Sequence, residues 1–171
     1  MINLSGQVRA GLYNRLAASF NTKLAEAARQ FSIQPFTIDF ASAPKSPNFF
    51  FGQLDPDDIE DSSVFKYPLM TVYTLQSADK NSPKPATFGG AIRGHVDIHL
   101  SWRGGNATID FEALGDALEA VMWSIFKDPT AQNWGLNIGL AQMGLDRGPH
   151  RFGAENWRQL LRFTFLFEVV G

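Results

Sequence analysis

The stretch "AIRGHVDIHLSWRG", residues 91–104, decides the fold class because apolar and polar side chains alternate along most of it. His95, Asp97 and His99 fall on one side of this alternation. The other side carries the apolar residues Ile92, Val96, Ile98, Leu100 and Trp102. Successive side chains of a strand point to opposite faces, so this period of two predicts a long β-strand with one face on a core.

The flanking segments predict two amphipathic helices. Apolar residues recur at every third or fourth position over residues 6–31 and again over 110–126, which is the spacing of one helix face. Ser5 and Asp110 stand at the start of these patterns. We expect both to cap their helices, because their side-chain oxygens can accept hydrogen bonds from free amides of the first turn.

Further strands are predicted around the two helices. They cover residues 36–40, a short piece within 48–52, residues 67–76, about 136–143, and 157–170. In the last strand Trp157, Phe163 and Phe165 share the apolar face, whereas Arg158 and Arg162 lie on the opposite face. This order of elements predicts an α+β fold, a mostly antiparallel sheet packed with two main helices.

The length of 171 residues suits a single domain that spans residues 1–171. A long excursion at about 41–66 interrupts the regular pattern with three prolines and a cluster of acidic residues. Within it, "DPDDIEDSS" has the arrangement of a helix start, because proline is favoured in the first helical turn directly after an aspartate cap. The ligand spacing of a calcium-binding loop is absent, so we interpret the segment as a solvated acidic turn.

Charge and composition exclude several classes of protein. The net charge of −2, with both signs interspersed, argues against a broad nucleic-acid grip. The absence of cysteine excludes disulfides and thiolate metal sites. No run approaches the roughly 20 apolar residues that span a bilayer, and the first thirty residues lack the apolar core of a signal peptide. We therefore expect a soluble protein that folds in the cytoplasm without membrane contact.

The residues His95, Asp97 and His99 raise the possibility of a metal site. A strand rises about 3.3 Å per residue, so the two histidine Cα atoms should lie about 13 Å apart. Zinc-bound atoms lie about 2 Å from the metal, so one ion cannot reach all three side chains on a regular strand. We predict an ordinary polar strand face, whose histidines pair with carboxylates of a neighbouring strand or with a partner chain. A small metal-dependent enzyme is the less favoured alternative.

Two groups of opposite charge are candidates for contacts between subunits. The second predicted helix carries a row of carboxylates about one turn apart, Glu112, Asp116 and Glu119. The loop and strand near the C-terminus carry the basic group Arg147, Arg151 and Arg158. Solvated surface charge is the simpler explanation of each group. In a ring, however, the acidic row of one subunit could meet the basic group of the next, because head-to-tail contacts need two different patches.

Catalytic signatures are missing from the sequence. The glycines of "FGGAIRG" and "WRGGN" form neither a phosphate-binding loop nor a dinucleotide fingerprint, and no nucleophile elbow or paired-histidine zinc motif occurs. We expect no enzyme activity, no cofactor and no bound metal. His95, Asp97 and the two charged groups are then candidate subunit-interface residues.

The order of elements resembles the tail terminator proteins of long-tailed bacteriophages, possibly those with contractile tails. An N-terminal amphipathic helix leads, after an excursion, to "YPLMTVY" at 67–73. The long strand "GGAIRGHVDIHLSW" at 89–102 precedes the helix "DFEALGDALEAVMWSIF" at 110–126. A basic loop then ends in "WRQLLRFTFLFEVV" at 157–170. The resemblance covers nearly the whole chain and concerns element order and hydrophobic pattern.

This resemblance implies a structural virion protein at the head-proximal end of the tail, assembled in the host cytoplasm. Such a protein caps the tail tube as a ring, usually a hexamer, stops tube polymerisation and offers a docking surface to the neck. Its partners are further copies of itself, the tail tube protein, the neck or connector protein and possibly the tail sheath. DNA only passes through the ring lumen. A neck or head-completion protein, which joins head and tail, is the near alternative.

Overall fold

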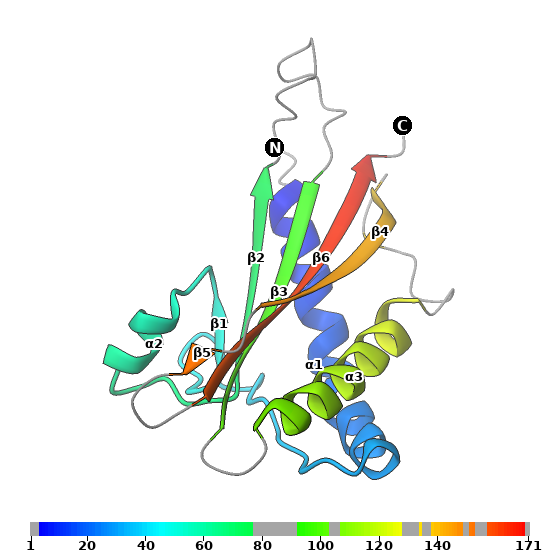
Figure 1. Cartoon of the computed structure of the whole chain (residues 1–171). Helices are drawn as coiled ribbons and strands as arrows, with labels where there is room; N and C mark the ends of the chain where they lie inside the picture. Colours follow the sequence, from blue (N-terminus) through cyan, green and yellow to red (C-terminus); the bar gives the residue numbers. More distant parts are fainter. Residues whose placement is uncertain are drawn as a thin grey trace.

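A computed structural model describes residues 4–76, 92–102, 107–127, 134, 138–148, 151–152 and 157–169. The elements within these residues are, in chain order, α1 (Leu4–Phe31), β1 (Phe49–Phe51), α2 (Pro56–Asp61), β2 (Leu69–Gln76), β3 (Ile92–Trp102), α3 (Ala107–Phe126), β4 (Ile138–Arg147), β5 (Arg151–Phe152) and β6 (Trp157–Val169) (Figure 1). Both predicted amphipathic helices are present as α1 and α3, and the alternating stretch is the strand β3.

The strands form one sheet in the order β1-β2-β3-β6-β4, and the short β5 pairs with β6. β1 runs parallel to β2, and the other pairings are antiparallel. The two longest strands, β3 and β6, lie side by side at the centre and stay in register from Ile92 opposite Phe167 to Trp102 opposite Trp157. The predicted α+β class, with a mostly antiparallel sheet, is confirmed.

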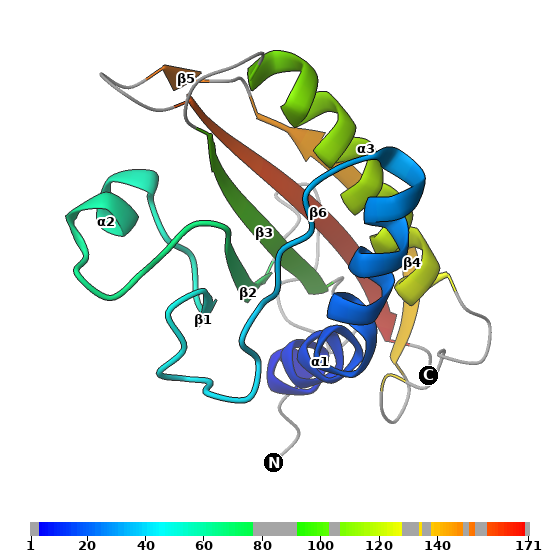
Figure 2. The same cartoon turned by 90° about the horizontal axis from the view of Figure 1, so that it is seen from below.

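Both long helices lie on the same face of the sheet (Figures 1 and 2). α1 packs on β2 and β3, and α3 packs on α1 and β6. The alternating strands turn their apolar sides toward the helices, so that Val96, Ile98 and Phe165 are completely buried. Gly94 lies where α1 crosses β3, and a Cβ there would come within 2.7 Å of Leu12 Cδ1. A glycine at this position therefore permits the close approach of helix and strand.

The opposite face of the sheet, called the outer face below, is covered at one end by the excursion. Phe50 of β1 and Phe65 contact one another edge-on, with ring centroids 5.5 Å apart. Ile59 of α2 is buried, as is Leu69 at the start of β2. The helix-start arrangement of the excursion is confirmed, and the segment interpreted as an acidic turn contains the short helix α2: Asp55 accepts a hydrogen bond from the Asp57 amide at 3.0 Å and Pro56 begins α2.

The strand predicted over residues 36–40 is wrong. The structure has no strand there, because the Asn21 side chain of α1 takes the place of a strand neighbour. Asn21 Nδ2 donates to the Ile38 carbonyl at 2.9 Å, and Asn21 Oδ1 accepts from the Ile38 amide at 2.8 Å. A side-chain amide thus satisfies the backbone groups that a ladder would have paired.

Both predicted helix caps are also wrong. α1 begins at Leu4 and α3 at Ala107, so Ser5 and Asp110 already lie inside their helices. Asp110 still lies in the first turn of α3, where a carboxylate interacts favourably with the helix dipole. No helix in the described part of the chain is long and apolar enough to cross a bilayer.

Candidate functional site

The polar side chains of β3 belong to a buried cluster at the centre of the outer face. Asp97 is fully shielded from solvent. Its carboxylate accepts hydrogen bonds from Arg162 Nε and Nη2, each at 2.9 Å, and from the Tyr73 hydroxyl, also at 2.9 Å. His95 and Thr164 complete the cluster, with 3.1 Å between His95 Nδ1 and Thr164 Oγ1. These five residues are the Asp97 network.

Strand register explains why these residues meet. β3 lies between β2 and β6, with Asp97 opposite Arg162 and His95 opposite both Tyr73 and Thr164. Opposed side chains on one face of an antiparallel pair lie about 5 Å apart, so they contact one another directly. The sequence pattern alone does not give the strand order. Sequence reasoning therefore missed Tyr73 and Thr164 as partners of β3 and placed Arg162 only on the polar face of the last strand.

The prediction of an ordinary polar strand face is wrong, and the pairing of the histidines with a partner chain stays a prediction. His95 and His99 are 8% and 2% exposed, so the polar side of β3 is not an ordinary solvated face. Among the described residues His95 has no ion pair with a carboxylate: its ring stacks on Tyr73, with centroids 5.0 Å apart, and its Nδ1 lies beside Thr164. Neighbouring strands on both sides, together with the excursion, remove these side chains from solvent.

The electrostatics of the Asp97 network favour one protonation state. Burial and the adjacent Asp97 charge raise the pKa of Tyr73 far above its usual value, so the phenol keeps its proton and donates it. The hydrogen bonds with Asp97 raise the pKa of Arg162, although burial acts against them. Burial lowers the pKa of both His95 and His99, with Asp97 acting in the opposite direction. At neutral pH the histidines are therefore uncharged.

The carboxylate of Asp97 has no oxygen that is free to bind a metal ion or a substrate. Both oxygens of this carboxylate are engaged by Arg162 and one also by Tyr73. Across the residues that the structure describes, no three His, Cys, Asp or Glu side chains converge as a metal site would require. The arrangement fixes three neighbouring strands to one another, which is a structural role.

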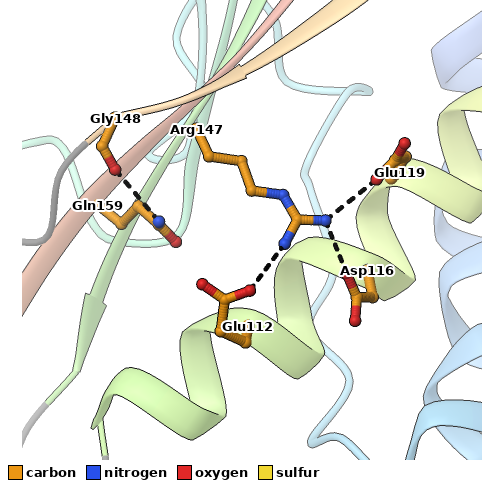
Figure 3. Close-up of polar contacts among 6 residues, drawn as sticks. All are labelled: Glu112, Asp116, Glu119, Arg147, Gly148 and Gln159. Atoms are coloured by element: carbon orange, nitrogen blue, oxygen red, sulfur yellow. Dashed lines mark hydrogen bonds and ion pairs between the residues drawn. The ribbon is translucent and has the colours of Figure 1, made fainter.

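A second cluster joins the edge of the sheet to α3 (Figure 3). Arg147 of β4 contacts Asp116 at 2.7 Å, Glu119 at 3.0 Å and Glu112 at 3.2 Å. The three carboxylate side chains are 42% to 60% exposed, whereas the Arg147 side chain is 24% exposed. These four residues are the Arg147 cluster. Burial opposes the charge of Arg147, but the hydrogen bonds to Asp116 and Glu119 outweigh it and raise its pKa.

The local structure brings Arg147 to the helix. Arg147 lies opposite Leu161 of β6, and Leu161 faces the helices, so Arg147 points to the same side. Gly115 of α3 leaves room for the guanidinium, because a Cβ there would lie only 3.0 Å from Arg147 Cζ. Sequence analysis assigned no role to Gly115. The acidic row and Arg147, which we expected to meet between subunits, thus already meet within one chain.

The remaining basic candidates have different surroundings. Arg158 pairs with two acidic residues of α2, with 2.9 Å from its Nε to Glu60 Oε1 and 3.8 Å from its Nη1 to Asp57 Oδ1. Arg151 belongs to β5, but its side chain lies outside the described part of the structure. The placement of these residues at a subunit interface stays a prediction.

An open hollow of about 510 Å³ lies beside the Arg147 cluster, between α3 and β4. Its apolar lining comes from Trp123 of α3, Met143 and Leu145 of β4, and Phe163 of β6. Arg147 and Glu119 contribute its charged side. Since these two side chains are bonded to each other, the hollow offers apolar surface rather than a poised acid, base or nucleophile.

The chain matches no known protein-family model and no curated protein. The fold and the side-chain geometry are therefore the basis for assigning a function.

Proposed function

We propose that this protein is a tail terminator of a long-tailed bacteriophage, a structural virion protein that caps the tail tube. The observation that carries the proposal is the order and pattern of elements: a long N-terminal helix, an excursion, a buried strand, a long alternating strand, a second helix and a long final strand. The resemblance rests on this order over nearly the whole chain.

The chemistry of the polar clusters favours assembly over catalysis. Asp97 and Arg162 hold one another, and Arg147 is held by three carboxylates. Groups that are paired in this way stabilise a scaffold, whereas catalysis needs a group directed at a substrate. The hollow beside β4 is lined mainly by apolar side chains, which suits contact with another protein.

The proposed ring has six copies and sits on the last ring of the tube, at the head-proximal end of the tail. Its partners are the tail tube protein on one side and the neck or connector protein on the other. The excursion at 41–66 offers extra surface for the sheath of a contractile tail, and it carries the exposed acidic residues Asp57, Asp58 and Asp61. DNA passes through the lumen without specific contacts.

The experiment is deletion of the gene in the virus that carries it, followed by electron microscopy of the lysate. We expect tubes of uncontrolled length that fail to join heads, and normal virions when the wild-type gene is supplied in trans. Tails of normal length that stay separate from heads would instead assign the protein to head completion. Normal tails joined to full heads would end both proposals.

A further inference from the structure

The sheet has two strand edges that no described strand covers. β4 is ten residues long and pairs with β6 on one side only. At the other end of the sheet, β1 pairs with β2 only at Met70, Thr71 and Val72. The remainder of β2, residues 73–76, has β3 on one side and no described strand on the other. Unpaired edges of this kind are templates for adding a strand from another chain.

Exposed apolar side chains accompany both edges. Leu75, in the uncovered part of β2, is 48% exposed, and Trp123, beside β4, is 38% exposed. These are two of the three large apolar side chains that are exposed in the described part of the chain, the third being Val64. Met143 and Leu145 of β4 are only half-buried and line the hollow beside Trp123. Apolar surface is thus exposed at both edges, on the outer face at Leu75 and on the helix-covered face beside Trp123.

Strand direction makes the two edges complementary. From β2 through β3 and β6 to β4, each neighbour is antiparallel to the last, so β4 runs opposite to β2. If copies are placed side by side with their helices on the same side, β4 of one copy meets β2 of the next in antiparallel orientation. We propose that the subunits join in this way, so that their sheets form one continuous antiparallel sheet around the ring.

This contact is heterologous, since one edge meets a different edge, and such contacts generate closed rings. The inference rests on the proposed function for its ring and adds the surfaces that build it. Its occupant is a second copy of this chain, because that copy supplies an uncovered edge of the required direction.

The position of β1 fixes how the copies are staggered. Within one copy, Leu75 pairs with Arg93, Arg93 with Leu166, and Leu166 with Gln142. If neighbouring copies were not shifted along the strands, Leu75 of one copy would therefore lie opposite Gln142 of the next. In that register, however, the end of β4 would occupy the place of β1. A shift of two residues puts Gly144 opposite Leu75 and leaves only Arg147 at the place of Phe51, whereas a shift of four puts Asp146 opposite Leu75 and removes the overlap of β4 with β1. A stagger is also what closing a sheet on itself requires.

The chain contains no cysteine, so introduced cysteines can test this register directly. Three double variants combine Leu75→Cys with Gln142→Cys, Gly144→Cys or Asp146→Cys. All four native positions are exposed and lie on the outer face, and a Cβ added at Gly144 meets nothing within 4 Å. Directly opposed residues bring their Cα atoms within the distance that a disulfide spans.

The variants are oxidised both as purified protein and in tails from the deletion virus complemented with each variant. We expect a ladder of covalent multimers, up to the closed ring, on non-reducing electrophoresis for the pair with Gly144→Cys or Asp146→Cys. Single variants should give no ladder. The pair Val64→Cys with Gly144→Cys is the matched control, since Val64 is exposed but belongs to the excursion and not to either of the two strands proposed to pair.

Absence of a ladder from all three pairs, in protein and in tails, would overturn the proposed strand pairing. So would covalent dimers of the single Gly144→Cys variant, which would indicate that β4 meets β4, or an equal ladder from the Val64 control. Complemented tails of normal length without any ladder would reject the pairing and keep the proposed function. If purified protein gives a ladder but deletion of the gene leaves tail length unchanged, the strand pairing would be kept and the proposed function rejected.

Discussion

Arg162 and Arg147 pair with carboxylates at similar distances but in different surroundings. Arg162 makes two hydrogen bonds of 2.9 Å to Asp97, which has no exposure to solvent. Arg147 meets three carboxylates whose side chains are at least 42% exposed. Removing one partner of a buried pair leaves an uncompensated charge, whereas exposed pairs contribute little. We therefore expect the Asp97–Arg162 pair to contribute more to stability than the Arg147 cluster, although the cluster contains more carboxylates.

Position in the sheet causes the difference. Asp97 lies on a central strand, with Thr71 and Arg162 opposite it on the two neighbouring strands. Arg147 lies at the end of an edge strand, where solvent reaches the carboxylates of α3. The surroundings of a polar residue thus follow from the order of strands, and its energetic role follows from those surroundings.

The largest effect is expected from Arg162→Met. This change leaves the buried Asp97 carboxylate with only Tyr73 among its described hydrogen-bond partners. We expect the free energy of unfolding to fall by about 3 to 5 kcal/mol, comparable to Phe163→Ala in the core at about 3 to 5 kcal/mol. The measurement is urea titration followed by circular dichroism.

The control for this prediction is the double variant Arg162→Met with Asp97→Leu. Because the second change removes the stranded charge, it should restore part of the lost stability. A nearly neutral Arg162→Met would contradict the assignment of Arg162 to a buried ion pair that matters for stability.

The fold was largely predictable from the sequence because its main elements carry strong periodic patterns. The alternation in β3 and β6 and the helical spacing in α1 and α3 each reflect one face on the core. The failure at residues 36–40 has a specific cause: the pairing of Ile38 with Asn21 is a side-chain contact that no periodicity encodes.

The candidate site was only partly predictable. Alternation placed His95 and Asp97 on one face, but their burial depends on which strands lie beside β3. Arg147 was placed in a loop because the strand was predicted to end near residue 143, and it was expected to face another chain because a head-to-tail ring needs complementary patches. β4 in fact runs to Arg147, and its alternation turns that residue toward α3 together with Met143 and Leu145.

Acidification is expected to lower the free energy of unfolding by an intermediate amount, through the buried histidines His95 and His99. The folded protein lowers the pKa of His95 and His99, mainly through burial, so protons bind the unfolded chain more tightly. Stability should therefore be constant above about pH 7 and should fall as the pH drops below about 6.5, the usual histidine pKa. Urea titrations between pH 5 and 8 measure this at constant ionic strength.

The variants His95→Gln and His99→Gln isolate the contribution of the two buried histidines of β3 to this slope. Each should flatten the decline between about pH 6.5 and 5, even if it lowers stability at neutral pH. The matched control is His150→Gln, which changes the chain's remaining histidine. A slope that is unchanged in both His95→Gln and His99→Gln and lost in His150→Gln would contradict the assignment of the slope to the buried histidines.

The smallest effect is expected at the Arg147 cluster. Arg147→Met removes contacts to three exposed carboxylates, so we expect a loss of about 1 kcal/mol or less, reduced further in 1 M salt by screening. Asp116→Lys should likewise leave the monomer folded. Any large effect of Asp116→Lys on ring assembly, measured by light scattering or in complemented tails, would then come from the subunit contact. A loss of several kcal/mol in urea titrations of Arg147→Met would instead show that the edge cluster matters as much as the buried pair, and the contrast between the two sites would fail.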